Sequence, residues 1–398
     1  MKYWMCRHKA NRVLDAKSST VCFKNPFNGR HTISNTRRHQ CPEVIAVSAI
    51  KEISWQFRKV ELPKLQSSKD PVVCIDSETR ARLHYLFTSN QQTADSSVVE
   101  LASKVAAKIV ELVNVEALAN TLKTPHSTKI LETWSEMKVA SFTRILLWCY
   151  ANSILSIAVK TQINLLAANT RNNIQALKDC SFKSRVMGVA HSHQQQLDER
   201  IQSEQLFLHT IQYFLNYGLD TLHVIIKRVV AEQLSSVPLT QCFTLAHLRD
   251  VLSMMCADIE TTILSSSQAD NSHGVTVYNI SCFVVPLAEM TVSANDQFLE
   301  KLLKSFGLWL NSPPCAALLR YFSGRTLEEL VDQIYRVWPT DSFGNSPHTI
   351  PASQLKFAKI IPIISDSYHA VAMSSQHGLL QRLQSDPMIA FCKSVFEA

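Results

Sequence analysis

The chain has 398 residues, of which 46% are apolar and 18% are charged, and 40 Lys and Arg against 33 Asp and Glu give a formal charge of +7. This length is sufficient for one large domain or two ordinary ones with sizeable apolar cores. Only 8 glycines are present, although phosphate-binding loops, nucleophile elbows and tight hairpins need residues that tolerate positive φ. The composition therefore favours an all-α chain and disfavours the enzyme classes built on such loops.

The positive charge is concentrated at the N-terminus. Residues 1–70 carry 14 Lys and Arg against 5 Asp and Glu, whereas residues 71–398 carry 26 against 28. A nucleic-acid-binding surface on the body of the chain is therefore not expected. Residues 1–75 contain four prolines and no sustained hydrophobic period, which predicts a poorly ordered basic leader. A mitochondrial-type presequence is the alternative interpretation of this segment.

No motif in the sequence predicts catalysis, a metal or a cofactor. The eleven cysteines include no Cys-x-x-Cys pair, so they are expected to be reduced and mostly buried, as in a cytosol-facing protein. The chain also lacks the Gly-rich nucleotide-binding motifs, the G-x-S-x-G elbow and the H-E-x-x-H zinc motif. His191 and His193 have no Cys or carboxylate partner nearby in the sequence and are expected to be solvent-exposed. We therefore expect neither a cofactor nor a small-molecule substrate.

Two helices are predicted before residue 171. Residues 91–97 form a polar linker or helix start, and apolar residues then recur at helical spacing from Ser97 to Leu122, where Thr124-Pro125 ends the pattern. A helix from about Thr128 to Thr170 would be about 60 Å long at 1.5 Å per residue. Its uncharged run 145–159 has 15 residues, fewer than the ~20 needed to span a bilayer. We therefore expect a buried core helix here.

The rest of the chain continues the helical pattern. A polar connection over 171–192 leads to a helical region over 193–236, with a bend predicted at Gly218, and Thr244 is expected to cap a helix that ends near Leu264. Residues 275–285 are expected to be extended because they are rich in β-branched side chains. Three further helices are predicted at 293–311, 313–323 and 326–338. A loop over 339–351 then leads to the segment 355–364 and to a final helix over 376–397, interrupted at Pro387. The predicted fold is a single large elongated bundle over residues 76–398, built around one or two very long helices.

Two sequence blocks carry a specific resemblance to a known family. Residues 129–144, KILETWSEMKVASFTR, resemble the most recognisable helix of the peroxin-3 family, and residues 357–364, FAKIIPII, resemble a second block of it. Weaker likeness extends over 160–166, 211–227, 239–248, 311–313 and the C-terminal tail. The resemblance therefore covers about residues 78–398.

The resemblance implies a binding scaffold and not an enzyme. Members of the family are helical docking proteins that face the cytosol on the peroxisomal membrane. They bind the soluble, farnesylated receptor called peroxisomal biogenesis factor 19, which delivers newly made membrane proteins. The receptor's amphipathic N-terminal helix lies in an apolar groove, and the residues of this chain that match the groove are Trp134, Met137, Leu122, Lys129 and Lys359.

The residue types suit this role independently of the resemblance. Trp134 and Met137 are three residues apart and share one helix face. Trp is a frequent hot-spot residue in interfaces, and Met adapts to irregular apolar contacts. Lysines such as Lys359 at a groove rim would favour an acidic partner helix. The alternative interpretations are an ordinary core position for Trp134 and a solvated surface charge for Lys359.

The N-terminal region departs from the family pattern. Family members begin with a short basic stretch followed by an apolar membrane anchor, and residues 1–75 do not resemble this arrangement. We expect an alternative or misassigned N-terminus to account for the difference. Two competing functions stay open: a soluble helical adaptor without a membrane role, and a helical enzyme with a polar pocket of perturbed acids.

Overall fold

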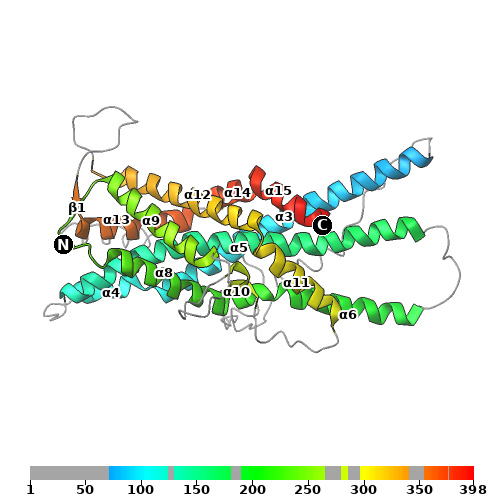
Figure 1. The fold of residues 1–398 in the computed structure, drawn as a ribbon, viewed down its shortest axis with the longest axis horizontal. Coiled ribbons are helices and arrows are strands. Elements are labelled where there is room, and N and C mark those ends of the chain that lie inside the picture. Colours follow the sequence, from blue (N-terminus) through cyan, green and yellow to red (C-terminus); the bar gives the residue numbers. More distant parts are fainter. Residues whose placement is uncertain are drawn as a thin grey trace, which may run out of the picture. The chain divides into compact units, whose positions relative to one another are not determined.

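The structure is a computed structural model that describes residues 71–123, 130–180, 190–264, 279–285, 296–339, 354–374 and 376–398. These ranges form helices joined by short connections, together with two strands of two residues each (Figure 1). The all-α fold class is confirmed. The elements are α3 (Pro71–Leu112), α4 (Val115–Lys123), α5 (Ile130–Cys180), α6 (Ala190–Leu208), α7 (Thr210–Tyr213), the π-helix η1 (Phe214–Gly218), α8 (Leu219–Leu234), β1 (Cys242–Phe243), α9 (Leu245–Leu264), α10 (Ile280–Val284), α11 (Gln297–Leu310), α12 (Pro313–Val337), β2 (Leu355–Lys356), α13 (Phe357–Ser374), α14 (Gln376–Leu383) and α15 (Asp386–Glu397).

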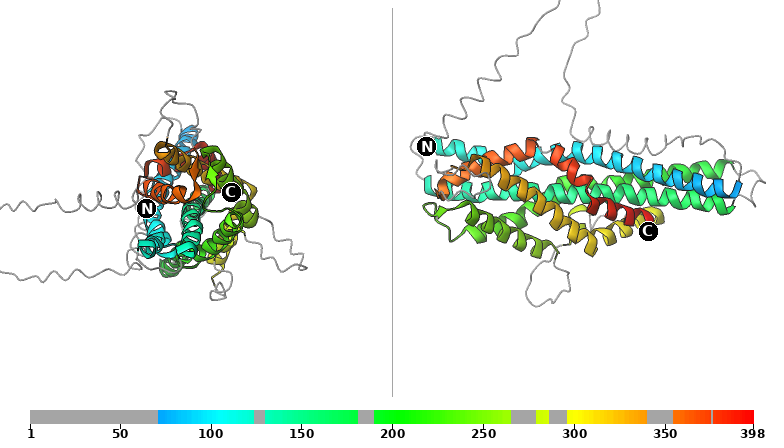
Figure 2. Two further views of the ribbon diagram at one scale, coloured as in Figure 1. Left: turned by 90° about the vertical axis from the view of Figure 1, so that its left-hand side faces the viewer. Right: turned by 90° about the horizontal axis from the view of Figure 1, so that it is seen from above.

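Helix α5 is the central element of the fold. It has 51 residues, and α3, α4, α8, α11, α12, α13 and α15 all pack against it. Helix α3 lies alongside α5 over much of its length (Figures 1 and 2). Every residue from Ser141 to Ala168 is buried, because neighbouring helices cover α5 on all sides.

The polar residues of α5 are compatible with this burial because several of their hydroxyl groups form hydrogen bonds within the helix. The hydroxyls of Ser141, Ser153 and Thr161 donate to the carbonyl oxygens four residues earlier, at 2.6–2.8 Å. Such back-bonding removes the cost of an unpaired buried hydroxyl. Residues 130–172 pass a length and composition test for a membrane span, but their apolar window is entirely buried. The prediction of a buried core helix over 145–159 is confirmed.

Several predicted boundaries are wrong. Residues 91–97 lie inside α3, which begins at Pro71 and ends at Leu112. The break falls at Asn114, whose Oδ1 accepts a hydrogen bond from the Ala117 amide at 2.8 Å and so caps α4. Helix α5 continues to Cys180, into the predicted polar connection.

In the second half of the chain, two more expectations are wrong and two caps are confirmed. Residues 313–337 form one helix in place of two, since Gly324 costs too little to end a helix held by tertiary packing. Residues 280–284 are helical, while 275–278 lie outside the described residues. Thr244 caps α9 by accepting a hydrogen bond from the His247 amide, and the interruption near Pro387 separates α14 from α15.

Candidate partner-binding site

The start of α5 presents an apolar strip. Met137 is buried, Trp134 is half-buried, and Ile130 is 50% exposed. These three residues are spaced i, i+4 and i+7, so they share one face of the helix. Leu131 beside them is 76% exposed. The intermediate exposure of Trp134 leaves part of the indole accessible to a partner.

The sequence analysis named Trp134 and Met137 but missed Ile130. The signal was present, because Ile130 precedes Trp134 by one helical turn in an otherwise regular apolar stripe. Large exposed apolar side chains on one helix face are a common feature of interaction sites.

Leu122 belongs to α4, the helix that precedes α5 in the chain. It is in the last turn of α4, is 8% exposed, and α4 packs against α5. Lys129, which the sequence analysis placed at the rim of the groove, lies outside the described residues.

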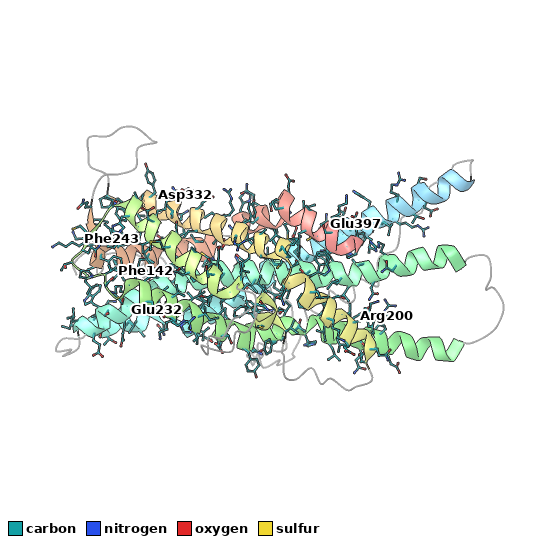
Figure 3. The ribbon with its side chains drawn as sticks, viewed as in Figure 1. Phe142, Arg200, Glu232, Phe243, Asp332 and Glu397 are labelled. Atoms are coloured by element: carbon teal, nitrogen blue, oxygen red, sulfur yellow. The ribbon has the colours of Figure 1, made fainter. Side chains whose placement is uncertain are left out.

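Lys359 is exposed in the first turn of α13. The start of α13 is fixed by the short β1–β2 pair, in which Phe243 is opposite Leu355. The ring of Phe357 lies 5.6 Å from that of Phe142 on α5 and 4.9 Å from that of Phe243. Figure 3 labels Phe142 and Phe243 near one another at the β1 end of the helices.

A second set of contacts joins α5, the segment that follows α8 and the start of α13. The Nζ atom of Lys138 donates to the carbonyl oxygens of Leu234 and Val237 at 2.8 and 2.9 Å, and burial lowers the pKa of this amine. Two residues further on, the carbonyl oxygen of Leu239 accepts from the amide of Ala358 at 3.1 Å. The turn after α8 therefore connects the position beside Met137 to the position beside Lys359.

A buried arginine joins α4, α5 and α13. Arg144 has no exposed surface, and its Nη1 atom contacts both carboxylate oxygens of Glu116 on α4 at 2.7 and 2.9 Å. Its Nη2 atom donates to the hydroxyl of Ser365 on α13 at 2.8 Å. The guanidinium also lies 4.6 Å from the ring centroid of Tyr368. The sequence analysis treated Arg144 only as part of a motif, although a charge on the buried side of a helix requires partners.

The surroundings of Glu116 make it a strong acid. Burial raises the pKa of this carboxyl, but hydrogen bonds from His369 and Arg144 and the charge of Arg144 outweigh burial and lower the pKa to about 2. The His369 Nε2 atom lies 3.1 Å from Glu116 Oε1. At neutral pH the carboxylate is therefore ionised and paired with Arg144.

This pairing predicts an acid-dependent part of the stability. Because the folded pKa of Glu116 is lowered from 4.5 to about 2, its contribution is present above about pH 4.5 and is lost as the pH falls toward about 2. We expect Glu116→Gln to unfold at lower urea concentration at pH 7 and to lose less further stability below pH 4.5 than the wild type. Urea titrations at a series of pH values measure the free energy of unfolding of both proteins as a function of pH. If this free energy falls equally with pH in the wild type and in the variant, Glu116 does not cause the acid-dependent loss.

The opposite face of α5 lines an open pocket of about 510 Å³. None of the predicted residues that the structure describes lines it. Its walls come from the end of α3, from α4, α5 and α8, and they are formed by Leu112, Val113, Asn114, Leu118, Ser135, Glu136, Val139, Ala140, Thr143, His223, Lys227 and Ala231. The pocket and the Trp134 strip are thus separate features of the same helix.

The thiols of Cys149 and Cys392 are buried in the core. Burial raises the pKa of the Cys392 thiol to about 12 and raises that of Cys149 further, which keeps these sulfurs protonated and unreactive. Across the described ranges, no group of three or more His, Cys, Asp or Glu could hold a metal ion.

Comparison with known proteins assigns the family. The family model described as Peroxin-3 matches residues 125–396, a span that includes α5, α13 and the C-terminal helices. The chain belongs to the peroxin-3 family. This family membership confirms the resemblance carried by residues 129–144 and 357–364, and it supports a role in peroxisome biogenesis.

Individual relatives agree with this assignment. The peroxin-3 chain is 28% identical over 329 residues to a Bos taurus protein named peroxisomal biogenesis factor 3, covering 80% of this chain and 84% of the relative. The Homo sapiens protein of the same name is 28% identical over 328 residues with the same coverage. A more distant relative, peroxisome biogenesis protein 3-1 of Arabidopsis thaliana, is 25% identical over 183 residues, or 44% of this chain and 47% of its own.

Proposed function

We propose that this protein is a docking factor at the peroxisomal membrane. It binds the farnesylated receptor, peroxisomal biogenesis factor 19, through the receptor's amphipathic N-terminal helix. The single observation that carries the proposal is the apolar strip at the start of α5, where Ile130 and Trp134 are partly exposed above the buried Met137, on a helix against which α4 and α13 pack. An apolar helix face and a flanking apolar side chain such as Leu122 suit helix-in-groove recognition.

Lysines at the rim of the proposed groove would favour an acidic partner. Lys359 is exposed in the first turn of α13, and complementary charges at an interface rim raise the association rate. We propose Lys129, which follows Pro125 in the connection before α5, as a second rim lysine on the basis of the family resemblance alone.

The decisive experiment is a titration of the full-length chain against a labelled peptide of the receptor's N-terminal helix, with Trp134→Ala beside it. We expect the variant to lose about 2 kcal/mol or more of binding free energy, because truncating a central Trp in an interface costs this much. The matched control is Trp309→Ala, which removes another half-buried Trp, on α11.

The outcomes separate the hypotheses. Loss of affinity in Trp134→Ala alone supports the docking site, and equal affinity in a folded Trp134→Ala variant rules it out. If the folded wild-type protein does not bind the peptide, the docking function is rejected and the adaptor hypothesis is favoured. Cell fractionation then tests location: sedimentation with peroxisomal membranes supports the docking factor, and an entirely cytosolic pool supports the adaptor.

A further inference from the structure

We infer that Arg144 is a positioning residue for the docking site, an inference that rests on the proposed function. Its guanidinium holds α4 and α13, which carry Leu122 and Lys359, at fixed positions beside the Trp134 strip on α5. Arg144 itself has no exposed surface, so it acts through the helices that it joins.

The geometry places the anchor directly behind the strip. Arg144 follows Met137 by seven residues, or about two helical turns, and lies on the same face of α5. Glu116 precedes Leu122 by six residues on α4, and Lys359 precedes Ser365 by six residues on α13. Each bonded partner is therefore about 9 Å along its helix from the candidate contact residue, at 1.5 Å per residue.

The guanidinium is suited to this task because it is planar and branched. One arm of Arg144 bonds the Glu116 carboxylate twice, and the other arm bonds the Ser365 hydroxyl. Lysine has a single point charge and cannot reproduce the fork. The face of the guanidinium also lies over Tyr368, whose hydroxyl donates to the Ala106 carbonyl oxygen on α3 at 3.3 Å. The anchor therefore has limited freedom to shift.

The chain offers a closely matched control for loss of a buried arginine. The side chain of Arg382 is 4% exposed and pairs with Glu329, which is 36% exposed; the corresponding values are 0% for Arg144 and 40% for Glu116. The pair of Arg382 and Glu329 joins α14 to α12. Neither of these two helices carries a candidate contact residue. Any effect of general destabilisation should appear equally in both variants.

The first measurement compares Arg144→Met with Arg382→Met in the full-length chain, at a temperature where urea titrations show both to be folded. We expect Arg144→Met to bind the labelled receptor helix at least tenfold more weakly than the wild type, and Arg382→Met to bind within twofold. Equal losses in the two variants, or wild-type affinity in Arg144→Met, overturn the inference.

A double-mutant cycle tests whether Arg144 acts through α4. We expect Leu122→Ala to weaken binding in the wild type and to have a smaller effect in Arg144→Met, because α4 is already displaced there. Additive losses contradict this route. If Arg144→Met does not fold, Arg144→Lys and Arg382→Lys carry the same comparison.

A partner-free measurement separates this inference from the proposed function. We expect amide hydrogen exchange in α4 and the middle of α13 to quicken in Arg144→Met and to stay unchanged in Arg382→Met. Unchanged exchange in both helices overturns the anchoring role. Failure of the wild type to bind the receptor helix, with exchange altered as expected, rejects the docking function and leaves Arg144 as the anchor of this surface.

Discussion

Lys160→Met is expected to lower the free energy of unfolding by about 3–5 kcal/mol, because removing one member of a buried ion pair leaves the other charge buried and uncompensated. The side chain of Lys160 is 1% exposed and that of Asp95 is 9% exposed, and their charged atoms lie 2.5 Å apart. The free energy is measured by urea unfolding of the full-length protein.

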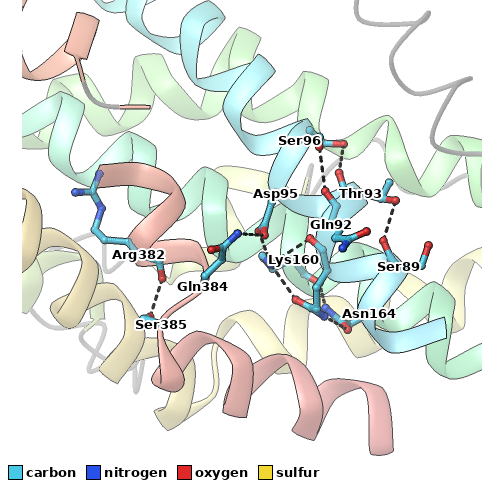
Figure 4. Close-up of polar contacts among 12 residues, drawn as sticks. Ser89, Gln92, Thr93, Asp95, Ser96, Lys160, Asn164, Arg382, Gln384 and Ser385 are labelled. Atoms are coloured by element: carbon cyan, nitrogen blue, oxygen red, sulfur yellow. Dashed lines mark hydrogen bonds and ion pairs between the residues drawn. The ribbon is translucent and has the colours of Figure 1, made fainter. Parts of the chain in front are cut away.

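The pair belongs to a buried network between α3, α5 and the C-terminal helices (Figure 4). Lys160 Nζ donates to Gln91 Oε1 at 2.9 Å, and Gln91 Nε2 donates to Asn164 Oδ1 at 2.9 Å. Gln384, which follows α14, reaches Asp95 Oδ2 at 3.5 Å. Each of these side chains provides a hydrogen-bond or ion-pair partner for another in low-dielectric surroundings. Loss of one side chain therefore leaves several others without a partner.

Two controls isolate the effect of burial. Lys104→Met removes a cation from an exposed pair with Glu100 on the same helix α3 and should cost less than about 1 kcal/mol. Adding Asp95→Leu to Lys160→Met removes the uncompensated charge and should recover about 2 kcal/mol or more. Equal stability of the single and double variants would show that the ion pair does not govern this part of the core.

This network explains why the sequence analysis misplaced the middle of α3. The polar stretch from Gln91 to Ser97 has the composition of a linker, yet it is helical, and two of its side chains, Gln91 and Asp95, pair with Asn164 and Lys160 across the interface with α5. The partners are about 70 residues away in the chain. Local hydrophobic period carries no information on such distant pairing.

Features that depend on neighbouring residues alone could be predicted from the sequence. The continuous apolar run in α5 predicted its burial, and Thr244 predicted the start of α9. The family blocks also singled out Trp134 and Met137 as candidate contact residues, which stays a prediction. The anchor made by Arg144 could not be foreseen, because Glu116 and Ser365 lie 28 and 221 residues from it and meet it only in the folded protein.

Gly218 is the other position where a distant contact determines the local structure. A bend was predicted there, and the structure has a π-helical turn over Phe214–Gly218 that continues directly into α8. A Cβ atom on Gly218 would lie 1.9 Å from the backbone oxygen of Phe283 in α10. Glycine is therefore required by the close approach of another backbone and not by its φ angle, since the φ of Gly218 is −63°.

Gly218→Ala should therefore lower the free energy of unfolding by about 2–3 kcal/mol, as overpacking of a close backbone contact does. The added methyl group must displace the carbonyl of Phe283, which cannot rotate away as a flexible side chain could. The better helix propensity of alanine, about 1 kcal/mol, offsets only part of this cost.

The matched controls are Gly307→Ala in α11 and Gly324→Ala in α12, where a Cβ would meet nothing within 4 Å. Both should leave stability unchanged or raise it by up to about 1 kcal/mol, since only the propensity term remains. Opposite signs at Gly218 and at the two controls, measured by urea unfolding, would show that the α10 contact holds the π-turn. A neutral Gly218→Ala would mean that α10 moves away at little cost, and the junction of α7 and α8 would then be set by the local sequence alone.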